Sequence, residues 1–153
     1  MGFGDSTPRL KEQGKRFAGR AVPVFMEGCL AVWMGETSDD ISFLYTDCLT
    51  SCTAVFIWYE VGDRVLGACL HYNSQGDPAE RVEAELLRNS AVLANVRRTA
   101  NCYITTGWGA GTTAPLVVRS FKEAGYKYIF ESITKTGSAC LDYEGGLYRR
   151  PSE

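Results

Sequence analysis

The sequence predicts an α+β fold, in which two main helices pack on a layered, mostly antiparallel β-sheet or sandwich. Short apolar runs bounded by turn residues recur through the first half of the chain, which is typical of strands. The run at 53–61 is apolar on both faces, as expected for a strand that is covered on both sides. Two segments with helical periodicity then alternate with further strands, and layered packing buries such elements.

The first strands are expected at 21–26 and 29–34, where "AVPVFM" and "CLAVWM" flank a Glu-Gly dipeptide. The polar stretch 35–40 reads as a loop, and the apolar run "ISFLYT" at 41–46 is the next strand. These strands lead directly into the segment that carries the candidate chemistry.

A long β-hairpin is predicted in the middle of the chain. Its first strand, 53–61, turns through "VGDR" and returns at 65–73 as "VLGACLHYN". Side chains alternate between the faces of a strand, so Val65, Gly67, Cys69 and His71 share one face. In this register Cys52 lies across from residue 72 or 73, one pleat from His71.

Two helices are expected after the hairpin. In the segment 76–98, Asp77 is a suitable N-cap, Pro78 suits the first helical position and Glu80 completes a capping box. A strand at 101–108 separates it from a second helix, which begins near Thr113 and stops at Gly125. The remaining elements are a strand at 126–133 and a closing hairpin at 139–150 that turns at Gly145-Gly146.

Composition indicates how many domains the chain forms and argues against some classes of partner. The chain has 153 residues, 45% of them hydrophobic and 22% charged, which is ordinary for one globular domain. We expect residues 1–20 to form a mobile or peripheral arm and residues 21–153 to form a single domain. The formal net charge of −2 argues against a nucleic-acid partner. No apolar run is long enough to span a bilayer, so we expect no membrane partner. The expected state is a monomer.

The expected compartment is the cytoplasm, either of the producing cell or of a host cell into which the protein is delivered. The N-terminal stretch lacks the apolar core of a secretory signal. The six cysteines are spread over apolar segments and form no C-x-x-C pair, which is typical of buried thiols in a reducing compartment.

Cys52 and His71, the only histidine in the chain, are the candidate nucleophile and base. A cysteine attacks as the thiolate, so it needs a partner that accepts its proton. Backbone N–H groups at Ser51 and Cys52 could face a developing oxyanion, because the thiol lies where a loop enters a strand. The candidates to orient the imidazole are Thr46 and three competitors, namely Asp47, Thr50 and Ser51.

This pattern resembles a known superfamily. Thr46, then "LTSC" at 49–52, then an apolar strand and His71 on the return strand are similar to the motif of the CheD chemoreceptor glutamine deamidases. They are also similar to the catalytic domains of cytotoxic necrotizing factor and Burkholderia lethal factor toxins. The toxins carry "LSGC" and CheD carries "LGSC". The order and spacing of later pieces such as "YITTGWGAG" extend the resemblance over about residues 40–150.

The resemblance implies that 21–153 is a deamidase-like catalytic domain that hydrolyses a protein glutamine to glutamate and releases ammonia. It implies Cys52 as the nucleophile, His71 as the base and Thr46 as the residue that holds the imidazole. The partner would be a protein with a surface glutamine, and no cofactor or metal is needed. "HYNSQGD" stands where CheD has "H-F-x-L-P". This departure favours a bacterial toxin or effector acting on a host protein.

Three alternatives remain open. The first is a chemoreceptor deamidase of the CheD type. The second is a non-enzymatic interaction domain or a zinc site, for which Cys48, Cys52, Cys69 and His71 supply the residue types of a closed Cys3His centre. The third is a Cys48–Cys52 disulfide switch, although their spacing in an irregular segment fixes no disulfide geometry.

Overall fold

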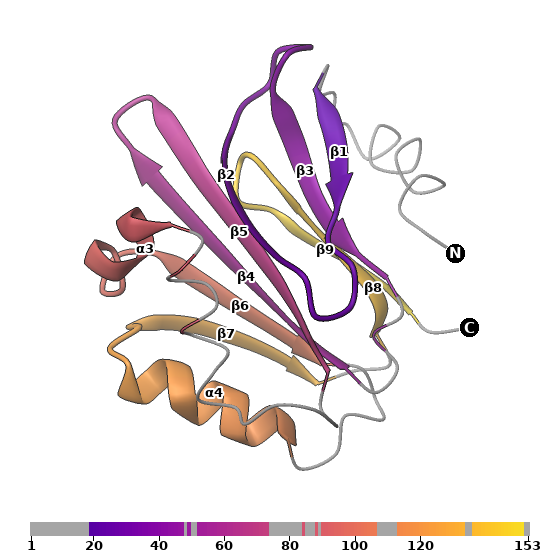
Figure 1. The fold of residues 1–153 in the computed structure, drawn as a ribbon, viewed down its shortest axis with the longest axis vertical. Coiled ribbons are helices and arrows are strands. Elements are labelled where there is room, and N and C mark those ends of the chain that lie inside the picture. The colour runs from indigo at the N-terminus through magenta and orange to yellow at the C-terminus, as the bar shows by residue number, and fades with distance from the viewer. Residues whose placement is uncertain are drawn as a thin grey trace.

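The computed structural model describes residues 19–47, 49, 52–73, 84, 88, 90–106, 113–133 and 136–151. In this part of the chain, nine strands form one hydrogen-bonded sheet with two helices beside it (Figure 1). The strands are β1 (Arg20–Pro23), β2 (Cys29–Met34), β3 (Ile41–Thr46), β4 (Cys52–Val61), β5 (Arg64–Asn73), β6 (Asn101–Thr106), β7 (Tyr128–Ile133), β8 (Thr136–Asp142) and β9 (Leu147–Pro151). The helices are α3 (Ala91–Asn95) and α4 (Thr113–Glu123).

The strands follow the order β7-β6-β4-β5-β2-β3-β8-β9, and β1 pairs with β3. Neighbours are antiparallel except in the pairs β1–β3, β2–β3 and β6–β7. The β2–β3 connection is a single pair, Met34 with Ile41. This mixed and mostly antiparallel sheet with two helices confirms the α+β expectation.

The long hairpin of β4 and β5 has a buried cluster on each face. Val55 and Ile57 contribute to a cluster that also holds Leu93 of α3 and Phe121 of α4. Their neighbours on β4, Ala54 and Phe56, belong to a second cluster together with Leu44 of β3 and Leu141 of β8. This is why β4 is apolar at both parities: each face lies against other elements. Cys52 belongs to the second cluster.

The prediction of one continuous helix over 76–98 is wrong, because the helix is interrupted at Ser90. This residue is extended (φ −158°, ψ 120°) and immediately precedes α3. Val96 has also left helical geometry. Serine and asparagine side chains compete for backbone hydrogen bonds in a helix interior, so the Asn-Ser dipeptide favours a break over a continuous turn. Ala84 and Arg88 are helical, and the rest of the expected first half lies outside the described residues.

The strand expected at 21–26 is shorter in the structure, where β1 ends at Pro23. The chain then reverses in a turn that we call the 25–28 turn, closed by the N–H of Gly28, which donates to the carbonyl of Phe25 at 2.7 Å. A Cβ at Gly28 would lie 2.7 Å from that carbonyl oxygen, so the turn requires glycine there. Glu27 has a left-handed φ of 65°. The 25–28 turn thus replaces the last residues of the expected strand.

The predicted turns of both hairpins are confirmed, with Gly62 at φ 62° between β4 and β5 and Gly145 at φ 88° between β8 and β9. Left-handed positions of this kind favour glycine. Within the described part of the chain, no helix has the length and hydropathy needed to cross a membrane.

Candidate active site

Thr46 and His71 meet at the centre of the candidate site. Thr46 is the last residue of β3, and His71 lies near the end of β5. The Oγ1 atom of Thr46 is 2.6 Å from Nδ1 of His71, and each residue is 1% exposed. The two side chains therefore form a buried, direct hydrogen bond between residues 25 positions apart in the sequence.

A second hydrogen bond fixes which atom donates. The hydroxyl of Thr46 donates to the backbone carbonyl of Val24 at 2.5 Å. A threonine hydroxyl has one hydrogen, and a carbonyl can only accept. The 2.6 Å contact with His71 therefore has Nδ1–H as the donor and Oγ1 as the acceptor. It follows that a neutral His71 carries its lone pair on Nε2.

The Nε2 atom of His71 is buried and has no hydrogen-bond partner among the residues that the structure describes. Burial also lowers the pKa of His71 from its ordinary 6.5 to about 4, because it disfavours the charged imidazolium. At neutral pH the ring is therefore neutral and offers an unused acceptor. That is the state required of a general base.

The backbone around His71 is held by the 25–28 turn. The N–H of Glu27 donates to the carbonyl of His71 at 2.8 Å, and the N–H of His71 donates to the carbonyl of Gly28 at 3.1 Å. Val24, just before the turn, donates its N–H to the carbonyl of Tyr45 at 2.8 Å. The turn therefore bridges β3 and β5 and positions the two partners of the imidazole hydrogen bond.

Cys52 begins β4 and is 3% exposed. It pairs with Asn73, while Ala54 pairs with His71, which confirms the predicted register of the hairpin. Paired residues of antiparallel strands share a face, so Cys52 and His71 are diagonal neighbours on the same face. Such neighbours lie roughly 7–8 Å apart, within reach of an aromatic side chain such as the imidazole.

Leu49 anchors the approach to Cys52. It is fully buried in the second cluster, and its N–H donates to the carbonyl of Gly137 at 3.0 Å. Its carbonyl accepts the N–H of Cys52 at 3.2 Å. In this conformation the Cys52 N–H is therefore engaged, and its expected oxyanion role requires that bond to be shared or broken. Ser51, the other expected oxyanion donor, lies outside the described residues, as does Thr50.

Thr105 on β6 is a polar residue of this face that sequence reasoning missed. It pairs with Ala54, which lies between Thr105 and His71 in one row across the sheet. Thr105 is fully buried, and its hydroxyl has no hydrogen-bond partner within the described part of the chain. The sequence gives no signal for it, because the pairing of β4 with β6 joins distant segments.

The cysteines near the site are buried. Cys69 lies two residues before His71 on the same face and is fully buried. Its pKa is raised well above the ordinary value, first by burial and then by the neighbouring Cys29 and Cys140. Among the described residues, no group of three or more His, Cys, Asp or Glu side chains is arranged to hold a metal ion. Cys48, which the zinc and disulfide alternatives both require, lies outside those residues.

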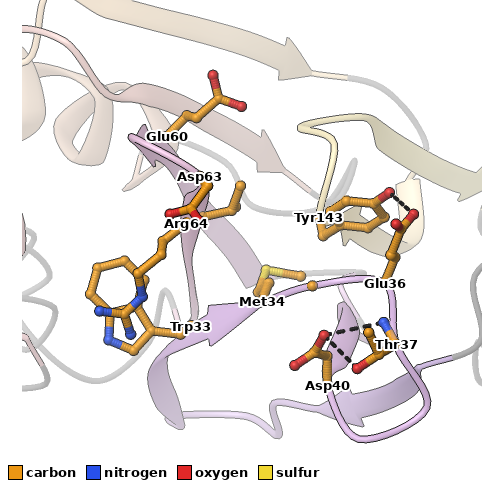
Figure 2. Close-up of a pocket in the computed structure, with 11 residues that line it drawn as sticks. Trp33, Met34, Glu36, Thr37, Asp40, Glu60, Asp63, Arg64 and Tyr143 are labelled. Atoms are coloured by element: carbon orange, nitrogen blue, oxygen red, sulfur yellow. Dashed lines mark hydrogen bonds between the residues drawn. The ribbon is translucent and has the colours of Figure 1, made fainter.

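A separate pocket of about 480 Å³ lies at the other end of the hairpin (Figure 2). Arg64 stacks 3.7 Å over the ring of Trp33, and the hydroxyl of Tyr143 donates to Glu36 at 2.7 Å. Glu60 lines this pocket, and the eight steps along the strand from Cys52 to Glu60 span roughly 26 Å. None of the lining residues described is a cysteine or a histidine, so the pocket is distinct from the Cys52 site.

Comparison of the chain with protein-family models gave no match, and comparison with curated proteins gave none either.

Proposed function

We propose that this chain is a cysteine-dependent protein glutamine deamidase, which converts glutamine to glutamate and releases ammonia through a thioester. One observation carries the proposal. The buried imidazole of His71 has its Nδ1 bonded to Thr46, and its Nε2 has no partner among the described residues, on the same sheet face as the Cys52 thiol. A base oriented by a third group, next to a nucleophile, is the arrangement that nucleophilic catalysis requires.

In the first half-reaction, Nε2 of His71 accepts the proton of Cys52, and the sulfur attacks the carboxamide carbon of the glutamine. The carbonyl oxygen becomes an oxyanion, which backbone N–H groups near Cys52 stabilise. The imidazolium then gives its proton to the departing nitrogen. The C–N bond breaks, ammonia leaves, and the acyl group remains on sulfur as a thioester.

In the second half-reaction, the neutral His71 takes a proton from a water molecule, which attacks the thioester carbon. The C–S bond breaks, glutamate leaves, and the proton returns to the sulfur of Cys52. The bond between Nδ1–H and Thr46 serves both halves, because it keeps Nε2 directed to the reacting atoms and stabilises the imidazolium. A primary amine in place of water would give transamidation.

The resemblance of Thr46, "LTSC" and His71 to the CheD and toxin deamidases supports the same chemistry. A layered sandwich is part of this proposal, and it is supported by the buried clusters on both faces of β4 and β5. We infer a bacterial effector with a host protein as its substrate from the sequence after His71, which departs from the chemotaxis type.

The proposal is tested by incubating the protein with a host-cell protein extract. Ammonia release and the mass change of glutamine to glutamate in the extract proteins are measured for the wild type and for Cys52→Ser. We expect both signals with the wild type only, and a fluorescent primary amine should label the same glutamines. Equal signals from the two proteins, or none from the wild type across extracts, would rule the activity out.

A further inference from the structure

The candidate site is closed in this structure. Cys52 is 3% exposed, and His71 and Thr46 are each 1% exposed. A glutamine side chain on another protein cannot contact a thiol covered to this degree. Some group over Cys52 must therefore move before the proposed reaction can begin.

Met26 contacts the thiol from the 25–28 turn. Its Sδ atom lies 3.9 Å from Sγ of Cys52, close enough for the S–H to donate weakly to the thioether. Met26 itself is 57% exposed. Its side chain therefore reaches from solvent to the sulfur of Cys52, along a path by which a slender group could replace it.

The backbone of the 25–28 turn is poorly suited to move, because its hydrogen bonds also hold His71. The N–H of Glu27 and the carbonyl of Gly28 both bond the backbone of His71. The methionine side chain is the movable part, since it is unbranched and has three rotatable bonds. Rotation of Met26 would uncover Cys52 and leave the imidazole in place.

We propose that Met26 is the gate of the site: its side chain closes the entrance over Cys52, and the substrate glutamine enters by displacing it. This rests on the proposed function for the identity of the substrate, whereas the gate itself concerns access to the thiol.

The gate is tested without any substrate, by the rate at which Cys52 is alkylated. Iodoacetamide carries a primary carboxamide like that of glutamine, and N-ethylmaleimide is a bulkier reagent. In Met26→Ala we expect alkylation of Cys52 to rise about tenfold with iodoacetamide and further with N-ethylmaleimide, as local opening becomes less costly. Fragmentation mass spectrometry assigns each label to Cys52.

Two variants serve as matched controls. Met26→Leu keeps a side chain of similar volume and should stay close to the wild-type rate. Phe25→Ala removes the neighbouring side chain, which is 75% exposed, and should leave the rate unchanged. Thermal unfolding of each variant establishes that it is folded. Wild-type rates in Met26→Ala, or an equal rise in Phe25→Ala, would overturn the gate. Failure of ammonia release would instead overturn the proposed function.

Discussion

Thr46 accepts the Nδ1–H of His71 at 2.6 Å while its own hydroxyl donates to the carbonyl of Val24. This pair of hydrogen bonds determines the tautomer of a neutral imidazole and leaves Nε2 as the acceptor. The orientation of the His71 ring therefore depends on the place where β3, β5 and Val24 meet.

Replacement of Thr46 by valine should damage the site more than replacement by serine. Valine has nearly the same shape but leaves Nδ1–H of His71 and the carbonyl of Val24 without their partner. We expect Thr46→Val to lower the free energy of unfolding by about 1–3 kcal/mol. Ammonia release should fall about 5–150-fold, which is what the same energy would cost if it were lost from the transition state.

Thr46→Ser keeps the hydroxyl and is the matched control. Urea denaturation and ammonia release, measured on both variants, check the prediction. If serine and valine at this position behaved alike, the hydroxyl would have no part in orienting His71.

The titration of His71 should make stability depend on pH. Its pKa is about 4 in the folded protein and 6.5 ordinarily, so between these values the unfolded chain binds more protons. The neutral ring therefore makes its full contribution to the free energy of unfolding above pH 6.5. That contribution is lost as pH falls toward 4, and it does not change further below pH 4. Carboxyl groups titrate near the lower end, so a comparison with His71→Gln is needed.

Urea denaturation at a series of pH values makes this comparison. We expect the wild type to lose more stability than His71→Gln as pH falls from 6.5 to 4. Parallel curves over that range would mean that His71 is as easily protonated in the folded protein as in the unfolded chain.

Leu49 should be critical for the position of Cys52. It is fully buried, and its backbone contacts both Gly137 and Cys52. We expect Leu49→Ala to lower the free energy of unfolding by about 2–5 kcal/mol, because a cavity forms in the second cluster. Leu116, which is 46% exposed on α4, is the control, and Leu116→Ala should change stability by less than about 0.5 kcal/mol. Chemical denaturation of both variants decides whether burial of Leu49 has this effect.

The hydroxyl of Thr105 should be dispensable for folding. It is buried with no partner among the described residues, so Thr105→Val should leave the free energy of unfolding unchanged or raise it by up to about 1 kcal/mol. A clear loss of stability in Thr105→Val would show that the hydroxyl is already bonded in the folded protein. If ammonia release falls while stability holds, the hydroxyl contacts the substrate.

The register between Cys52 and His71 could be predicted because a short turn joins two long apolar strands. The role of the Val24 carbonyl as a partner of Thr46 could not be predicted. Every residue has a carbonyl, and this one reaches Thr46 only through the long-range pairing of β1 with β3. Met26 was expected in a strand, because the sequence pattern does not show that β1 stops at Pro23. Local patterns thus identified the candidate residues Cys52 and His71, and non-local pairing supplied the groups that contact them.

The most direct test of the central claim is the rate of Cys52 alkylation by iodoacetamide, measured from pH 6 to 10 in the wild type and in His71→Ala, with zinc content read on the same samples. If His71 accepts the thiol proton, the wild type at pH 7 should react about a hundredfold faster. The gap should narrow as pH rises, because hydroxide then removes the thiol proton in both proteins. Equal rates at pH 7, or stoichiometric zinc with a protected Cys52, would contradict the account.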